Sequence, residues 1–323
     1  MTCGALPECA VSLIQSVRLF RTFPPEKGDL MKLKHWIVFI LLGAIWSASF
    51  LWIKIALAEV GPFTLVAFRV GFGLLTGIVI TLFLRIPLPR DWKTWRVFII
   101  LGISNVAVPF FLITWGEQTI DSAVASILNA TVPLFTIVMA QFFLRDDKLT
   151  LPRVLGLLIG FLGVVVLLSE NVDPHGHNSL IGQLAVIVAS ASYAISYIYA
   201  RRNTRDVRGE IRGVLPLVSA FAVMAAIVPF AETPLRIPHL PITWIGLIWL
   251  GVLGTGLAMI MQYYLVHEIG PTRATLVTYI FPLGGVVLGV IFLHEPLTWQ
   301  LAAGAALIIS SIAVVNWKPP THD

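Results

Sequence analysis

Residues 133–144 read PLFTIVMAQFFL, and residues 282–293, which lie 149 positions later, read PLGGVVLGVIFL. The same offset aligns further positions upstream: Leu101-Gly102 with Leu250-Gly251, Trp115 with Tyr264, and Ile120 with Ile269. A register that is kept from residue 101 to residue 144, with a proline in both copies, indicates an internal duplication. The two copies decide how the rest of the chain is interpreted.

The composition is that of a membrane protein. Hydrophobic residues make up 57% of the 323 residues and charged residues only 12%, whereas soluble domains carry about 25% charged residues. The net charge of +5 lies mostly in short segments between apolar runs, so it indicates membrane topology and not nucleic-acid binding. The only cysteines, Cys3 and Cys9, exclude a disulfide framework and a cysteine zinc site.

Ten apolar segments have the length that a membrane-spanning helix needs, which is about 20 residues. The sequence therefore predicts an all-α integral membrane protein with ten transmembrane helices. The segments are 36–57, 63–84, 97–116, 122–144, 154–169, 179–200, 213–231, 241–266, 274–293 and 298–317.

The distribution of Lys and Arg predicts the orientation of these helices. If both termini are cytoplasmic, 19 of the 22 Lys and Arg residues lie in cytoplasmic segments, two in spans and one outside. Five spans in each half then give two inverted repeats, which transporters use to alternate between two states. The predicted units are a cytoplasmic tail over 1–33, repeat 1 over 34–169, an external loop over 170–178, repeat 2 over 179–318 and a C-terminal tail over 319–323. Translation starts at either Met1 or Met31.

Four motifs carry a resemblance to a known family. They are Gly43-Ala44-Ile45-Trp46-Ser47-Ala48-Ser49-Phe50 with Lys54, Pro62 with Phe68-Arg69, and the two hinges Leu144–Thr150 and Leu293-His294-Glu295-Pro296-Leu297-Thr298. Over residues 36–317 the chain resembles the EamA-type ten-helix branch of the drug/metabolite transporter superfamily. The resemblance implies export or exchange of small metabolites, such as amino acids or related compounds, across the cell inner membrane. The first hinge departs from the family pattern by carrying Asp146-Asp147.

Enzyme and pump motifs are missing from the sequence. It contains no phosphate-binding glycine loop, and His294-Glu295-Pro296 lacks the second histidine of a zinc protease helix. We therefore expect a secondary transporter, with no cofactor and no metal, that works by alternating access around a midplane cavity. An uptake permease or facilitator of the same fold is the alternative, and a membrane-embedded enzyme is an alternative of another class. Because Glu117 at the end of the third span is the nearest carboxylate to any span interior, we predict that transport does not strictly require a pH gradient.

Candidate substrate-binding residues are polar or aromatic side chains in the spans and the paired prolines. Prolines at equivalent positions of inverted repeats point to a midplane site, although they also fit simple packing kinks. Arg69 either binds a substrate carboxylate, pairs with a gate residue such as Glu117, or is structural. The other side chains contact either a substrate or one another. The full set is Trp46, Arg69, Asn105, Asn129, Pro133, Tyr193, Tyr197, Gln262, Tyr279 and Pro282.

Small residues mark the fifth and tenth spans. Gly156, Gly160 and Gly163 lie in the fifth span, and Gly304 lies in the tenth. Small residues allow helices to approach closely in a bilayer, so these faces are either scaffold or the surface of a homodimer. The expected partners are thus a small-molecule substrate, the lipid bilayer and a second copy of the chain, but no nucleic acid.

Overall fold

The computed structural model describes residues 33–143, 151–169, 178–204, 207, 209–234, 236–269, 277–278 and 280–315. The predictions for the two tails, the hinge Leu144–Thr150, the external loop 170–177 and Tyr279 lie outside these residues. All the regular elements of the described ranges are helices.

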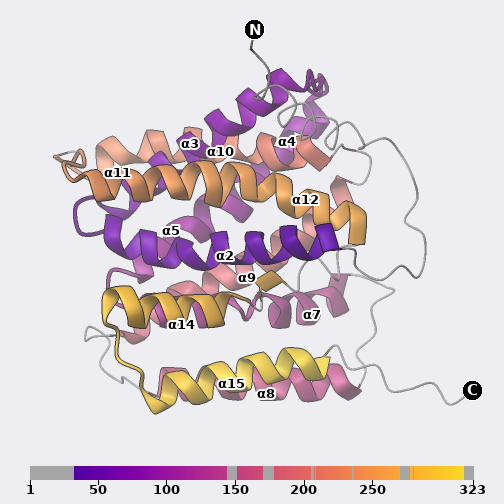
Figure 1. Cartoon of the computed structure of the whole chain (residues 1–323). Helices are drawn as coiled ribbons and strands as arrows, with labels where there is room; N and C mark the ends of the chain where they lie inside the picture. The colour runs from indigo at the N-terminus through magenta and orange to yellow at the C-terminus, as the bar shows by residue number, and fades with distance from the viewer. Residues whose placement is uncertain are drawn as a thin grey trace, which may run out of the picture.

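The helices follow one another in two matching series (Figure 1). The first is α2 (Leu33–Ala56), α3 (Pro62–Phe83), α4 (Trp92–Gly102), η1 (Ile103–Ala107), α5 (Val108–Gly116), α6 (Ser122–Asn129), α7 (Val132–Phe143) and α8 (Leu151–Leu168). The second is α9 (Leu180–Asn203), α10 (Gly209–Ala231), α11 (Pro241–Ile248), η2 (Trp249–Leu257), α12 (Ala258–Ile269), α14 (Ile280–Leu293) and α15 (Trp299–Val315). The segments η1 and η2 are π-helical.

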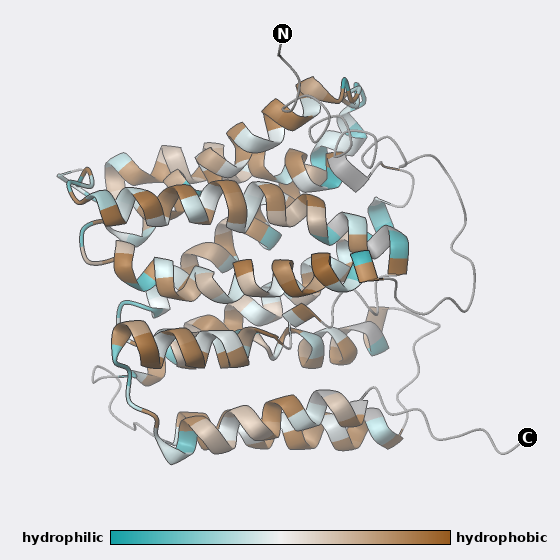
Figure 2. Ribbon diagram, in the orientation of Figure 1, coloured by the Kyte–Doolittle hydropathy of each residue, from teal (hydrophilic) through white to brown (hydrophobic). Residues whose placement is uncertain are grey.

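Seven helices are long and apolar enough to cross a membrane, and three apolar helices are shorter. Hydrophobic residues extend along the helices, whereas hydrophilic residues gather at the ends of the bundle and in the connections (Figure 2). The chain is thus an all-helical protein with several candidate membrane spans, and the count of ten spans stays a prediction. The seven are Leu33–Ala56, Pro62–Phe83, Trp92–Gly116, Ser122–Phe143, Leu180–Asn203, Ile211–Ala231 and Pro241–Gln262; the three are Val154–Leu168, Ile280–Leu293 and Trp299–Ser311.

The duplication is visible in local structure. At the offset of 149 residues, the π-helical segment η1 falls within η2, so a wide turn interrupts the same helix in both halves. The indole nitrogen of Trp95 donates to the carbonyl of Pro89 at 3.0 Å, and that of Trp244 donates to Pro238 at 3.1 Å. Both partners of this contact recur at the same offset, which supports a common origin of the halves.

Corresponding helices run in opposite directions. At one end of the bundle, Lys54 near the end of α2 bonds the carbonyls of Glu117 and Ile120, between α5 and α6. Thr119 and Ser179, just before α9, hydrogen-bond at the same end. The first helix of the first half thus ends where the first helix of the second half begins.

The predicted interruption in the fourth span lies immediately before Pro133. Helix α6 ends at Asn129 and α7 begins at Val132, because a proline cannot donate a backbone hydrogen bond to the preceding turn. The hydroxyl of Thr131 donates to the carbonyl of Leu128 at 2.6 Å and satisfies part of the broken ladder. In the second half, Pro282 is the third residue of α14, so both prolines lie at the start of a helix.

Helices α8 and α15 form a pair at one edge of the bundle (Figure 1). A Cβ atom added to Gly163 would lie 3.0 Å from the backbone oxygen of Gly304, so the two small-residue faces pack against each other within the chain. Gly163 and Gly304 are thus used for a contact within the chain. A homodimer through the faces of these helices stays a prediction.

Candidate functional site

The centre of the bundle is built where α3 packs against η2. A Cβ atom on Gly73 would lie 2.6 Å from the side chain of Thr255, and one on Gly251 would lie 2.9 Å from the backbone oxygen of Arg69. These two glycines let a helix of the first half approach the π-helical segment of the second half closely. The approach places Arg69 between the halves.

Arg69 is buried, with 6% of its surface exposed. Its Nε donates to the hydroxyl of Thr255 at 3.2 Å, and its guanidinium carbon lies 3.8 Å from the ring centre of Phe110. Within the described part of the chain, no carboxylate forms an ion pair with it. The three interpretations of Arg69 from the sequence, a substrate contact, a gate contact and a structural role, stay predictions. A buried guanidinium without a carboxylate partner can bind an anion.

Trp46 lies at the same boundary. Its indole nitrogen donates to the carbonyl of Gly254 in η2 at 3.0 Å, and its ring meets Phe281 edge-on at 5.8 Å. A reciprocal contact joins the other helices, because the hydroxyl of Ser192 in α9 donates to the carbonyl of Ser104 in η1 at 2.7 Å. In both cases the first helix of one half binds the π-helical segment of the other.

Tyr193 extends the aromatic wall on the α9 side. It packs against two of the hydrophobic clusters, one of which also contacts Trp46 and the other of which contains Phe110. Tyr197 stacks on Tyr193 with ring centres 6.2 Å apart, but 42% of its surface is exposed. The structure therefore brings Trp46, Arg69 and Tyr193 to one region and leaves Tyr197 at its edge.

Three predicted polar residues carry buried side-chain oxygens without a hydrogen-bond partner among the described residues. They are Asn105 in η1, Asn129 at the end of α6 and Gln262 in α12. These elements pack against α9 or α2, the first helices of the two halves. An unsatisfied buried oxygen costs free energy, so a bound ligand or water is the ordinary partner for such groups.

Of the two predicted prolines, Pro282 is buried and Pro133 is half-buried.

Two carboxylates that cap helices of the opposite half were not predicted. Glu295 accepts from the backbone amides of Ser122 and Ala123 at 2.7 and 3.0 Å, at the start of α6. Glu232 does the same for Phe63 and Thr64 at the start of α3, with the same two distances. Neither helix is capped by the residue that precedes it. Gly61 before α3 has no side chain, which the sequence shows, whereas Asp121 before α6 is bonded to Asn178, which only the structure shows.

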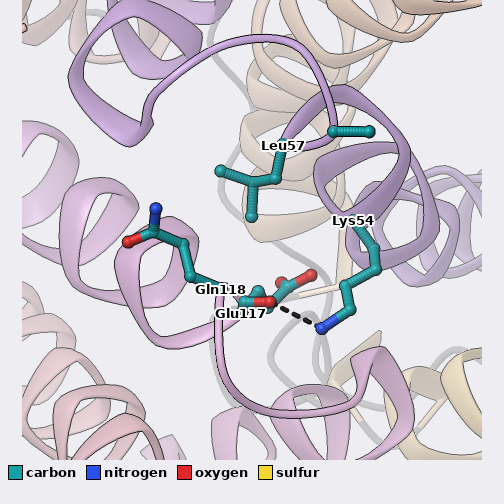
Figure 3. A pocket seen from close by; sticks show the side chains of 5 residues that line it. Lys54, Leu57, Glu117 and Gln118 are labelled. Atoms are coloured by element: carbon teal, nitrogen blue, oxygen red, sulfur yellow. Dashed lines mark hydrogen bonds between the residues drawn. The ribbon is translucent and has the colours of Figure 1, made fainter.

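A pocket of about 300 Å³ lies at the same end of the bundle (Figure 3). Its lining consists of Lys54, Leu57, Ala58, Glu117 and Gln118. The ammonium group of Lys54 points to the backbone oxygen of Glu117, at 2.7 Å, and not to the carboxylate. This pocket lies at the end of α2 and α5, away from the contact between Trp46 and η2.

Comparison with known proteins agrees with the two-part architecture. The model of a family described as EamA-like transporters matches two stretches, residues 34–169 and 180–317. An uncharacterized transporter of Archaeoglobus fulgidus is 28% identical over 88% of this chain and 100% of its own length. The uncharacterized transporter YvbV of Bacillus subtilis is 27% identical, over 90% and 94% of the two chains. A chain of known crystal structure is similar in fold, with a TM-score of 0.63 and 22% identity over 88% of this chain and 98% of its own.

Proposed function

We propose that this chain, which belongs to the EamA-like transporter family, carries a small carboxylate-bearing metabolite, such as an amino acid or a related compound. A member of this family is a membrane transporter and not an enzyme. Transport proceeds by alternating access around a cavity between inverted halves of five spans each. The protein is an exporter or exchanger, and uptake by the same machinery is the alternative, because the gradients set the net direction.

One observation carries the choice of substrate class. Arg69 is held between the halves by Thr255 and Phe110, and no described carboxylate neutralises it. A planar guanidinium suits a carboxylate geometrically, since it can donate two parallel hydrogen bonds. The bare oxygens of Asn105, Asn129 and Gln262 would accept hydrogen bonds from the amino or hydroxyl groups of the same substrate.

The direct test is flux in proteoliposomes that contain the purified protein. A panel of amino and organic acids is compared with the matching amines, which lack the carboxylate. We expect uptake by exchange for carboxylate-bearing compounds only, and a loss of about 5- to 150-fold for Arg69→Gln, because removing one contact to a bound ligand costs ~1–3 kcal/mol. Arg69→Lys keeps the charge but loses the planar fork, so it should recover only part of the rate.

Trp95→Phe is the matched control for Trp46→Phe. Both changes remove an indole donor from a carbonyl at about 3 Å, but Trp95 lies near the start of α4, outside the site. We expect normal transport by Trp95→Phe and slower transport by Trp46→Phe at equal expression. If Arg69→Gln carries acids at the wild-type rate, the substrate is not held by this arginine and the proposal is wrong.

The orientation is proposed from the positive charges of the sequence. Reporter fusions after Lys318 and within residues 201–212 should read cytoplasmic, and fusions within residues 232–240 should read external. Arg201, Arg202, Arg205, Arg208 and Arg212 all lie in or beside the second of these segments. A periplasmic signal from that segment would contradict both the orientation and the inverted arrangement in the membrane.

A further inference from the structure

Glu117 is a buried carboxylate that no described residue neutralises. It is the first residue after α5, and none of its surface is exposed. Neither carboxylate oxygen has a hydrogen-bond partner within the described ranges. Although Glu117 lies at a helix end, the packing of the surrounding helices buries it completely.

The charged groups around Glu117 come from three elements and are all bonded elsewhere. Lys54 of α2 donates to the backbone oxygens of Glu117 and Ile120, both at 2.7 Å. Arg69 of α3 is bonded to Thr255, and Glu295, which follows α14, caps α6. These three charges act on Glu117 electrostatically, but none of them forms an ion pair with its carboxylate in the described structure.

Asp121 is the remaining acidic group nearby in the sequence. It accepts a hydrogen bond from the side-chain amide of Asn178 at 2.8 Å, so it is occupied as well. An ionised carboxylate that is buried without hydrogen bonds costs several kcal/mol, and such a group takes up a proton instead. Burial raises the pKa of the Glu117 carboxyl group, and the negative charge of Glu295 raises it further, whereas the positive charges of Lys54 and Arg69 lower it.

A proton fits this position better than a metal cation does. The ammonium group of Lys54 already occupies the two backbone oxygens that a cation would need. No group of three metal-binding side chains occurs in the part of the chain that the structure describes. Glu117 itself lines the adjacent pocket, together with Lys54 and the exposed Gln118 (Figure 3).

We propose that Glu117 is the proton-binding site of this transporter, protonated in the conformation described here and exchanging its proton through the adjacent pocket during the transport cycle. The proton comes from water on one side and returns to water on the other, and the O–H bond of Glu117 alone forms and breaks. This inference rests on the proposed transport function.

The position of Arg69 links the proton to the substrate. An anion that binds Arg69 adds negative charge near Glu117 and so favours the protonated carboxyl group. Linkage is reciprocal, so a proton on Glu117 also strengthens the binding of the anion. Substrate and proton therefore move in the same direction. A substrate gradient alone still drives transport, and a pH gradient adds to it.

Infrared spectroscopy of the full chain in lipid tests the proton directly, without a known substrate. We expect the C=O stretch of a protonated carboxyl group at neutral pH in the wild type and its loss in Glu117→Gln. Glu59→Gln is the matched control, because Glu59 lies at the same end of the bundle but accepts hydrogen bonds from His239 and Leu240. It should leave the signal unchanged. Glu117→Asp, which keeps a titratable group, should restore a signal at a shifted position if Glu117→Gln folds poorly.

The signal itself decides the first step. Absence of a protonated carboxyl group in the wild type, or its persistence in Glu117→Gln, overturns the proposal whether or not a substrate is known. Coupling is then measured with a pH dye inside the liposomes and a transported acid from the flux panel. The wild type should move protons with the acid, and Glu117→Gln should move the acid without them. Equal proton movement by both proteins contradicts coupling at Glu117. If none of the compounds in the panel is transported, only the proposed substrate class is contradicted.

Discussion

The two ends of the helix bundle are held together by different kinds of contact. At the end that contains Glu117, the carboxylates of Glu232 and Glu295 from the second half cap α3 and α6 of the first half. Glu59 of the first half accepts hydrogen bonds from the backbone before α11 in the second. Carboxylate oxygens thus replace the missing partners of helix amides on both sides of the boundary.

At the opposite end, the described ion pairs between the halves involve Glu268 of α12. It lies 3.4 Å from Lys34 and 3.2 Å from His35, and 59% of the Lys34 side chain is exposed. The exposed pair with Lys34 contributes little to stability, whereas the buried hydrogen bonds of Glu295 contribute more. We therefore expect the end with the buried Glu295 cap to be held together more firmly.

Among the variants that test the difference between the two ends, Glu295→Gln should have the largest effect. Glu295 is buried, with 8% of its surface exposed, and it serves two amides of α6. Replacing its charge should destabilise the protein by about 2 kcal/mol, because hydrogen bonds to charged groups exceed neutral ones. Thermal unfolding of the purified protein measures the loss. An unchanged melting temperature would show that the start of α6 does not depend on this carboxylate.

Glu232→Ala should have a smaller effect, about 1 kcal/mol, because this cap is half-buried and water can replace it. Gly61→Ala sharpens the result, since a Cβ atom at Gly61 would overlap the carboxyl group of Glu232. The φ angle of Gly61 is −75°, so alanine itself is not strained there. Gly61→Ala should destabilise the wild type and have no effect beside Glu232→Ala. If the losses of stability in the two single variants add up in the double variant, Gly61 and Glu232 do not interact and this explanation is wrong.

Glu268→Gln should have the smallest effect, within about 1 kcal/mol, because its partner Lys34 is largely exposed and its buried partner His35 is charged only when protonated. The loss should disappear at high salt, which screens exposed charges, and the effect of Glu295→Gln should not. Melting curves at low and high ionic strength provide both results. A salt-resistant loss for Glu268→Gln, equal to that for Glu295→Gln, would remove the difference between the ends.

Local patterns predicted the elements of the fold well. The repeated PL and FL positions of residues 133–144 and 282–293 indicated the duplication, and Pro133 marks the start of α7 as expected. The π-helical segments could not be predicted, because their wide turns depend on donors such as Trp46 and Ser192 that come from the other half.

The candidate site was predicted only as a set of residue types. The sequence left Arg69 open between a substrate contact and a structural role, and its burial depends on glycines such as Gly73 and Gly251, which let α3 approach η2. The sequence placed Glu117 at the end of the third span, and only the packing of the helices buries it completely. Contacts between such distant residues follow from packing and not from local sequence.

One contact occurs in both halves and so bears on the gene duplication: Trp95 donates to Pro89, and Trp244 donates to Pro238. A feature found in both halves dates from the ancestral unit, before the gene duplicated. The π-helical segments η1 and η2 are a second such feature. Glu117 and Arg69 have no charged counterparts, since Val266 and the region of Val218 occupy the matching positions. The scaffold is thus common to both halves, whereas these two charged side chains are particular to the first half.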